Sequence, residues 1–301
     1  MNPLDSHGGS STSLDNYEFT FEAFLQDSAR IEPDVSPSYH YPNDPTENER
    51  LDDQHDILRI VLDGRNHLAP FSRANPPRRV LDVATGTGTW AIEMGDEYPE
   101  SQIAGTDLSP IQPSYVPPNV RFFVEDSGED WHYTQKFDYI HTRMTLGCCL
   151  RRPLAGGYFE CQEVLCLPST DDDTLPASSA LLKWMADLKA ASDEADRVLY
   201  LGPLLRQWLE EVGFQDVREV VYKIPVNGWP RGRALKQVGQ MWQRNLVNGL
   251  SGFSLGLLGR VRGRSVEDIE RQLVDVRREL FDQTIHAYQK FYVVWGRKPE
   301  A

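Results

Sequence analysis

The feature that most constrains the fold is a short apolar segment that runs directly into a glycine-rich turn. Residues 79–84 read Arg-Val-Leu-Asp-Val-Ala, and Thr-Gly-Thr-Gly-Thr follows at 85–89. An apolar run of this length predicts a buried strand, and the segment 90–98 after the glycines predicts a helix. Gly86 and Gly88 remove side chains at the turn, so that a ligand can approach the backbone at the helix N-terminus. The segment therefore predicts a strand–turn–helix unit that binds a small molecule.

Further apolar segments alternate with helical ones along the chain. Strands are predicted at 102–106, 120–124, 137–141 and 157–164, and two more at 216–226 and 289–295. Strands that alternate with helices indicate a parallel sheet with helices packed on its faces. Together with 79–84, these segments predict a doubly wound, Rossmann-like α/β fold. Its mostly parallel sheet would have seven strands, the last two forming an antiparallel edge.

The 301 residues suffice for one large α/β domain with additions. Residues 1–38 are rich in Ser, Asp, Gly and Pro, which predicts a disordered tail before a folded domain at 39–301. Asp44, Pro45 and Glu47 predict the start of a helix that ends near Gly64. Helices at 232–248 and 265–283 are predicted within an insertion at about 229–284. We expect this insertion to form a hydrophobic lid, because it contains Trp229, Met241, Trp242 and Phe253.

Carboxylates follow three successive predicted strands. Asp82 lies at the end of the first strand, Asp107 follows the second, and Asp126 follows the third. Because the carboxyl ends of parallel strands meet at one edge of a sheet, we expect these acids near the glycine turn. Asp107 can accept hydrogen bonds from two ribose hydroxyls, and Asp126 can accept one from an adenine amino group. A role as helix caps or solvated turn residues is the alternative, and their shared position at the ligand edge disfavours it.

The glycine turn alone fits two kinds of ligand. Residues 86–91 also match the G-x-G-x-x-A dinucleotide pattern, with Asp107 about 20 residues further on. Asp82 separates the two interpretations, since a carboxylate beside the turn repels a pyrophosphate. The same carboxylate suits the ammonium and sulfonium groups of S-adenosylmethionine. The sequence therefore favours S-adenosylmethionine, and a nicotinamide dehydrogenase is the disfavoured alternative.

Residues 80–91, Val-Leu-Asp-Val-Ala-Thr-Gly-Thr-Gly-Thr-Trp-Ala, resemble motif I of the class I methyltransferases. The segments 41–55, 105–120 and 137–143 are similar to those of the LaeA-like methyltransferases of fungal secondary metabolism. The resemblance is good over residues 39–166 and loose in the C-terminal half. It implies S-adenosylmethionine as the cofactor and a role in fungal natural-product metabolism. The predicted cofactor-binding residues are Asp82, Ala84, Gly86, Gly88, Asp107, Leu108, Asp126 and Ser127.

One segment departs from this family. Residues 145–156 connect the predicted strands at 137–141 and 157–164, where the family has a full helix. Their length is close to the minimum for a parallel crossover, and Pro153 restricts the segment further. Because that helix borders the acceptor pocket in the family, a deletion here would affect stability and activity together.

Catalytic candidates are few, because methyl transfer is accelerated largely by positioning the acceptor. His141 and Tyr41 are the predicted catalytic residues, since both are expected near the pocket mouth. The alternatives are a structural hydrogen bond for His141 and packing for Tyr41. For Arg143 we favour a salt bridge with Asp138 or Glu160 over the anchoring of a substrate carboxylate.

Composition limits the partners. The 31 Lys and Arg residues against 45 Asp and Glu residues give a net charge of −14, which disfavours binding to nucleic acids or anionic membranes. No stretch approaches the ~18 consecutive apolar residues of a membrane span, and no secretion signal is evident, so we expect a cytoplasmic or nuclear protein. No metal site is predicted, because the acidic run 171–173 lies in a polar loop and the four cysteines lack zinc spacing.

Two functions remain open. The first is methylation of an oxygen, nitrogen or carbon atom of a small natural product. The second is a LaeA-like regulatory protein that acts through protein partners, with weak or no catalysis. The predicted tail and the short crossover favour the second, and the acidic surface with the apolar insertion favours the first.

Overall fold

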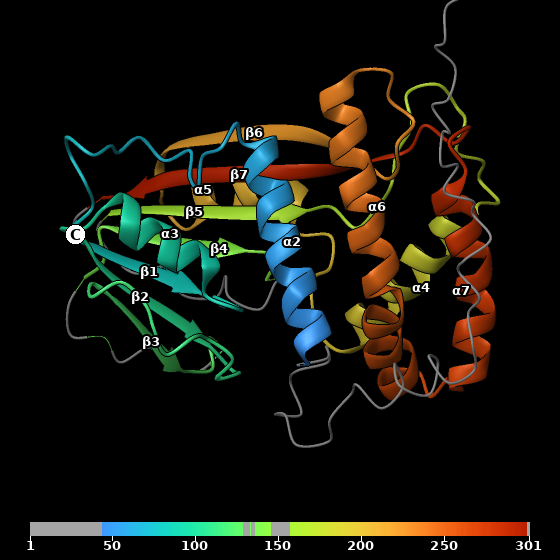
Figure 1. Ribbon diagram of the computed structural model, residues 1–301, viewed down its shortest axis with the longest axis horizontal. Coiled ribbons are helices and arrows are strands. Elements are labelled where there is room, and N and C mark those ends of the chain that lie inside the picture. Colours follow the sequence, from blue (N-terminus) through green and yellow to red (C-terminus); the bar gives the residue numbers. More distant parts are fainter. Residues whose placement is uncertain (1–43, 129–132, 134–135, 146–156, 300–301) are drawn as a thin grey trace, which may run out of the picture.

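A seven-stranded sheet forms the centre of the computed structural model, which describes residues 44–128, 133, 136–145 and 157–299 (Figure 1). The strands are β1 (Arg79–Val83), β2 (Gln102–Asp107), β3 (Val120–Val124), β4 (Tyr139–Arg143), β5 (Gly157–Val164), β6 (Gln215–Pro225) and β7 (Tyr288–Lys298). Their order is β3-β2-β1-β4-β5-β7-β6. The first five run parallel, and β7 is antiparallel to both β5 and β6. This confirms the predicted doubly wound, Rossmann-like and mostly parallel sheet.

The fourth strand begins two residues later than the predicted 137–141. The side chain of Asp138 accepts hydrogen bonds from the backbone N–H groups of Arg78 and Arg79 at 2.8 and 2.9 Å. The first residue in register with β1 is therefore Tyr139, opposite Val80. As a result, His141 lies opposite Asp82 in the middle of the strand rather than at its end.

Helices pack on the sheet and extend beyond it. They are α2 (Pro45–Val61), α3 (Thr89–Glu97), α4 (Ala180–Glu194), α5 (Leu205–Glu211), α6 (Arg233–Ser254) and α7 (Val266–Phe281). As predicted, Asp44 caps α2, and its Oδ1 accepts a hydrogen bond from the backbone N–H of Glu47 at 2.9 Å. Figure 1 shows α4, α6 and α7 gathered beyond the ends toward which β1 and β2 point.

The helix α4 is missing from the prediction. Its apolar residues recur at intervals of three and four, and Leu181, Trp184, Met185 and Leu188 are all buried. Ser179 caps the helix by accepting a hydrogen bond from the backbone N–H of Leu182 at 3.2 Å. This period and this cap are the sequence signals that could have identified the helix.

Three helical segments lie between β6 and β7, where an insertion at about 229–284 is expected. The helix α6 continues to Ser254, six residues past the predicted end, and runs into the π-helical segment η3 (Leu255–Val261). Its Trp242 shares one buried apolar cluster with Trp184 of α4 and Leu273 of α7. The insertion and α4 therefore form one helical layer with a common core.

Several expectations fall outside the described residues. They concern the tail at 1–38, Tyr41, two of the four cysteines (Cys148 and Cys149) and nearly all of the crossover at 145–156. Among the residues that are described, no helix has both the length and the apolar character needed to cross a bilayer. The same part of the chain contains no cluster of His, Cys, Asp and Glu side chains able to hold a metal ion.

Packing around Phe122 explains a glycine in the middle of β2. A Cβ atom placed on Gly105 would lie 2.7 Å from two atoms of the Phe122 ring and 2.9 Å from Thr85 Oγ1. These distances are too short for van der Waals contact. Gly105 therefore lets Phe122 of β3 pack close to the loop that follows β1.

We expect Gly105→Ala to lower the free energy of unfolding by about 1–3 kcal/mol, because the added methyl group overpacks this contact. Urea denaturation of both proteins measures the change. Gly232→Ala is the matched control, since no atom lies within 4 Å of its added Cβ. Equal stability of the Gly105→Ala and Gly232→Ala variants would contradict the packing explanation.

Candidate functional site

The loop after β1 has an unusual backbone. Ala84, Gly86 and Gly88 have φ angles of +57°, +59° and +84°, a left-handed region that favours glycine. A Cβ atom on Gly86 would have only Leu51 Cδ1 near it, at 3.8 Å, so the backbone at Gly86 is open to a ligand. A Cβ atom on Gly88 would instead collide with the ring of Phe122. Gly86 thus fits the predicted ligand approach, whereas packing accounts for Gly88.

Asp107 joins this loop to the end of β2. Its Oδ2 accepts a hydrogen bond from the backbone N–H of Gly86 at 2.8 Å, and its Oδ1 accepts one from Ser109 N–H at 3.0 Å. A carboxylate has about four acceptor positions, so acceptor capacity remains on Asp107 for a ligand. Burial raises the pKa of Asp107, while the backbone hydrogen bonds oppose that shift. Leu108, the next residue, is half-buried.

The end of β3 lies against the end of β2. The backbone N–H of Glu125 donates to the carbonyl oxygen of Asp107 at 3.0 Å. Asp126 follows, and its Oδ1 accepts a hydrogen bond from Gly128 N–H at 2.8 Å. Both Asp126 and Ser127 are half-buried. The structure therefore brings the predicted cofactor residues of three strands to one edge of the sheet.

Asp82 lies beneath the loop rather than on its surface. It is 3% exposed, and its Oδ1 is 2.7 Å from Nδ1 of His141. Its Oδ2 accepts a hydrogen bond from the hydroxyl of Thr85 at 2.5 Å. Both oxygens therefore have partners within the protein. Asp82 shapes the loop through Thr85 and places a negative charge directly below it.

His141 is completely buried, and its ring stacks on Trp90 at 3.8 Å between centroids. Burial lowers the pKa of His141, and Asp82 opposes the shift. The imidazole is therefore neutral at physiological pH and donates its Nδ1–H to the Asp82 carboxylate. The expected position at the pocket mouth is wrong, because β4 carries His141 opposite Asp82 in the core. Its geometry is that of a residue that positions Asp82.

Arg143 does not form the expected salt bridge. Its Nε donates to Gln162 Oε1 at 2.8 Å, and its Nη1 is 2.9 Å from His55 Nδ1. Glu160 is occupied by the backbone N–H groups of Leu68 and Ala69, at 2.6 to 3.0 Å. The loop before β1 thus satisfies this buried carboxylate in place of an arginine.

The helix α2 closes over the loop through an acid that the sequence analysis does not single out. Asp52 Oδ1 accepts hydrogen bonds from the hydroxyls of Thr87 and Thr89 at 2.6 and 2.8 Å. On the opposite side, the side-chain amide of Gln112 donates to the carbonyl oxygen of Gly86 at 2.7 Å. Nothing in the local pattern around Asp52 or Gln112 marks these contacts, because each joins segments far apart in the chain.

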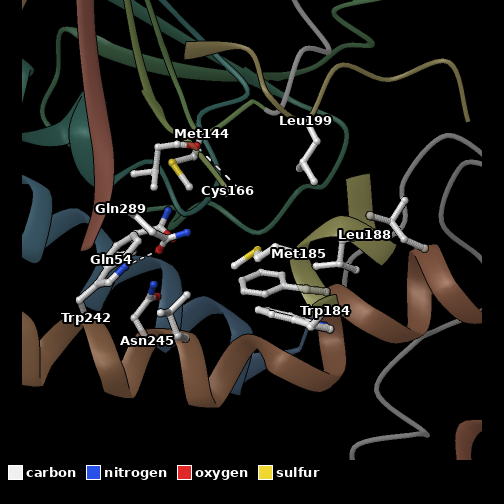
Figure 2. Close-up of a pocket in the computed structure, with 14 residues that line it drawn as sticks. Gln54, Met144, Cys166, Trp184, Met185, Leu188, Leu199, Trp242, Asn245 and Gln289 are labelled. Carbon is white, nitrogen blue, oxygen red and sulfur yellow. Dashed lines mark hydrogen bonds between the residues drawn. The ribbon is translucent and has the colours of Figure 1, made fainter. Parts of the chain in front are cut away.

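A largely apolar pocket lies beyond the carboxyl ends of β4 and β5 (Figure 2), where about 520 Å³ of space, open solvent included, is free of atoms. Met144 borders it after β4, and Cys166 borders it after β5. The remaining walls come from α2, α4, α6, η3 and β7, from the end of β5 and from the loop after α4. They are Gln54, Val164, Trp184, Met185, Leu188, Leu199, Trp242, Asn245, Leu246, Phe253, Leu257 and Gln289.

The insertion contributes to this pocket in part as expected. Trp242 and Phe253 line it. Trp229 does not, because its Nε1 donates to the carbonyl oxygen of Ala287 at 2.9 Å and its ring lies 4.9 Å from that of His286. The wall contributed by Trp184 and its neighbours belongs to α4, the helix that the sequence analysis misses.

Comparisons with known proteins agree with this arrangement. The family model described as "Methyltransferase domain" matches residues 54–219. The chain is 36% identical to "Methyltransferase pytC" of Aspergillus terreus over 273 residues, which cover 87% of this chain and 84% of that protein. It is 35% identical to "Secondary metabolism regulator LAE1" of Cochliobolus heterostrophus, with 87% and 90% covered. It is 31% identical to "Probable methyltransferase tdiE" of Emericella nidulans, with 85% and 83% covered.

The buried imidazole of His141 makes stability depend on pH. Below about pH 6.5 His141 becomes protonated in the unfolded chain but stays neutral in the folded protein. The free energy of unfolding therefore falls as pH falls. We expect His141→Gln, which can still donate to Asp82 but does not titrate, to flatten this dependence. The slope should decrease by up to about 1.4 kcal/mol per pH unit, the value for one proton. Urea denaturation between about pH 7.5 and pH 5 measures it, and identical slopes would contradict a neutral His141.

Proposed function

We propose that this chain methylates a small-molecule acceptor bound in the apolar pocket. The chain belongs to the LaeA-like group of class I S-adenosylmethionine-dependent methyltransferases of fungal secondary metabolism. One observation carries this proposal. The helix α2 borders both sites, because Asp52 binds the glycine loop and Gln54 lines the pocket. The proposed cofactor and acceptor sites therefore both border α2, at positions two residues apart.

The residues around the glycine loop fit S-adenosylmethionine, the cofactor of the family. The open backbone at Gly86 would receive it, and the free acceptor positions of Asp107 would hold its ribose hydroxyls. Asp126 would accept a hydrogen bond from the adenine amino group. Ala84, Gly88, Leu108 and Ser127 would form the rest of the site. When bound, S-adenosylmethionine supplies a methyl group carried on a positively charged sulfur.

The chain itself contributes electrostatics and positioning. Because His141 is neutral, the Asp82–His141 pair has a net charge of −1 directly below the loop, which attracts a cation. Among the described residues that line the pocket, only Cys166 can ionise, and burial raises its pKa to about 12. The described residues of the pocket walls therefore offer no general base at neutral pH. We infer that they act by orienting the acceptor and excluding water.

A second candidate function follows from the relatives. Several proteins that are 32–35% identical to this chain over 87% of its length are named secondary metabolism regulators. Under this second proposal the chain acts through protein partners, in the cytoplasm or the nucleus, with weak or no catalysis. Methyl transfer to a small molecule by the purified protein would favour the first function. A protein partner that copurifies with a chain lacking turnover would favour the second.

Binding of S-adenosylhomocysteine tests the cofactor site. We expect the wild-type protein to bind it and Asp107→Asn to bind it at least about tenfold more weakly, because one oxygen that accepts hydrogen bonds is lost. Isothermal titration measures both affinities. Asp96→Asn is the matched control, since Asp96 is an exposed acid on the outside of α3. Equal affinities for the two variants would refute the assigned role of Asp107, and no binding by folded wild-type protein would refute the active enzyme.

A further inference from the structure

Arg50 of α2 is buried beside the pocket and connects two of its walls. Its Nε and Nη2 donate to the carboxylate of Glu47 at 2.8 and 2.7 Å, which neutralises the guanidinium charge within one turn of helix. Its Nη1 donates to Gln54 Oε1 at 3.0 Å and to Asn245 Oδ1 at 2.7 Å. One arginine therefore holds a side-chain amide of α2 and a side-chain amide of α6 in fixed orientations.

These contacts decide which atoms face the pocket. A guanidinium group can only donate hydrogen bonds, so the atoms that face Arg50 are the amide oxygens of Gln54 and Asn245. Their NH₂ groups are left as donors on the side of the pocket, where Figure 2 shows both side chains. Within the described chain neither nitrogen has an acceptor, although Gln54 and Asn245 are only 7% and 3% exposed.

The other polar side-chain groups of the pocket are already bonded. Trp242 Nε1 donates to Gln289 Oε1 at 2.8 Å, and Gln289 Nε2 is 3.5 Å from the carbonyl oxygen of Leu165. Trp184 Nε1 donates to Ser254 Oγ at 2.8 Å. The two NH₂ groups held by Arg50 are therefore the polar features that a ligand would meet in this wall.

The rest of the pocket favours apolar, uncharged ligands. Its other walls are aromatic and aliphatic, with Trp184, Trp242 and Phe253 offering flat faces for ring packing. None of the lining residues carries a charge that could pair with a charged ligand, and burial of an unpaired charge is strongly unfavourable.

We propose that the pocket binds an uncharged aromatic acceptor through a carbonyl oxygen, which accepts hydrogen bonds from the NH₂ groups of Gln54 and Asn245. This inference rests on the proposed function, in which the same pocket holds the methyl acceptor. It assigns acceptor specificity to two amides and to the arginine that orients them. Carbonyl compounds are preferred over acids, because the site donates two hydrogen bonds without carrying a net charge.

The test uses prodan, a naphthalene that carries a propionyl group and a dimethylamino group and whose fluorescence responds to its surroundings. Its dissociation constant is measured by fluorescence titration with saturating S-adenosylhomocysteine. In Asn245→Asp and Gln54→Glu the oxygen that faces Arg50 is kept and the NH₂ donor is replaced by an acceptor. We expect each variant to bind prodan at least about tenfold more weakly, because a hydrogen bond becomes a repulsion between two acceptors.

Two controls separate recognition from disturbance of the pocket. A probe in which propyl replaces the propionyl group lacks the carbonyl oxygen, and its affinity should be the same for the wild-type protein and both variants. Gln240→Glu adds the same charge on an exposed position of α6 and should leave prodan affinity unchanged. Unchanged prodan affinity in both pocket variants, or an equal loss for the propyl probe, would overturn the proposal.

The proposed function and this inference fail in distinguishable ways. If the folded wild-type protein does not bind S-adenosylhomocysteine, the enzyme itself is refuted. If it binds S-adenosylhomocysteine but not prodan, the carbonyl site is refuted and the cofactor site stands. Normal S-adenosylhomocysteine binding by Asn245→Asp and Gln54→Glu shows that the variants are folded.

Discussion

The structure depends on the left-handed loop between β1 and α3, because the proposed cofactor contacts are arranged around it. This backbone shape is unfavourable on its own, and three acids from different elements hold it in place. Asp82 binds Thr85 from below, Asp107 binds Gly86 from β2, and Asp52 binds Thr87 from α2. Each acid also has a fixed place in the sheet or in a helix. The loop is therefore formed by the packed fold before a ligand arrives, and binding need not supply the free energy to order it.

The helix α2 connects the two halves of the proposed active site. One turn contacts the glycine loop through Asp52, and neighbouring positions hold the pocket through Arg50 and Gln54. Because Arg50 also binds Asn245 of α6, α2 and the helical insertion are joined at a buried, neutral cluster. A shift of α2 would disturb the cofactor loop and the acceptor wall together. This physical link explains how a pocket built in part by inserted helices stays aligned with a site built by the sheet.

The buried polar groups below the loop serve stability and electrostatics at once. His141 is desolvated by Trp90 and neighbouring strands, yet it satisfies one oxygen of Asp82. A neutral imidazole in this place adds no positive charge beside Asp82, whereas a protonated one would. The same burial that keeps the imidazole neutral makes the fold sensitive to acid. Stability and attraction of a cationic cofactor thus depend on one protonation state.

The sequence alone determined the sheet, its glycine loop and the acids at its edge. The spacing of apolar residues, the residue types in the turn and the residues that follow each strand are all local properties of the chain. It did not reveal that Asp82 and His141 face each other below the loop, since that depends on the register between β1 and β4. It also missed α4 and the donors at Gln54 and Asn245. Their role exists only where Arg50, 195 residues before Asn245, approaches that side chain. Tertiary structure decided these features because contacts between distant segments leave no mark on the local pattern of either one.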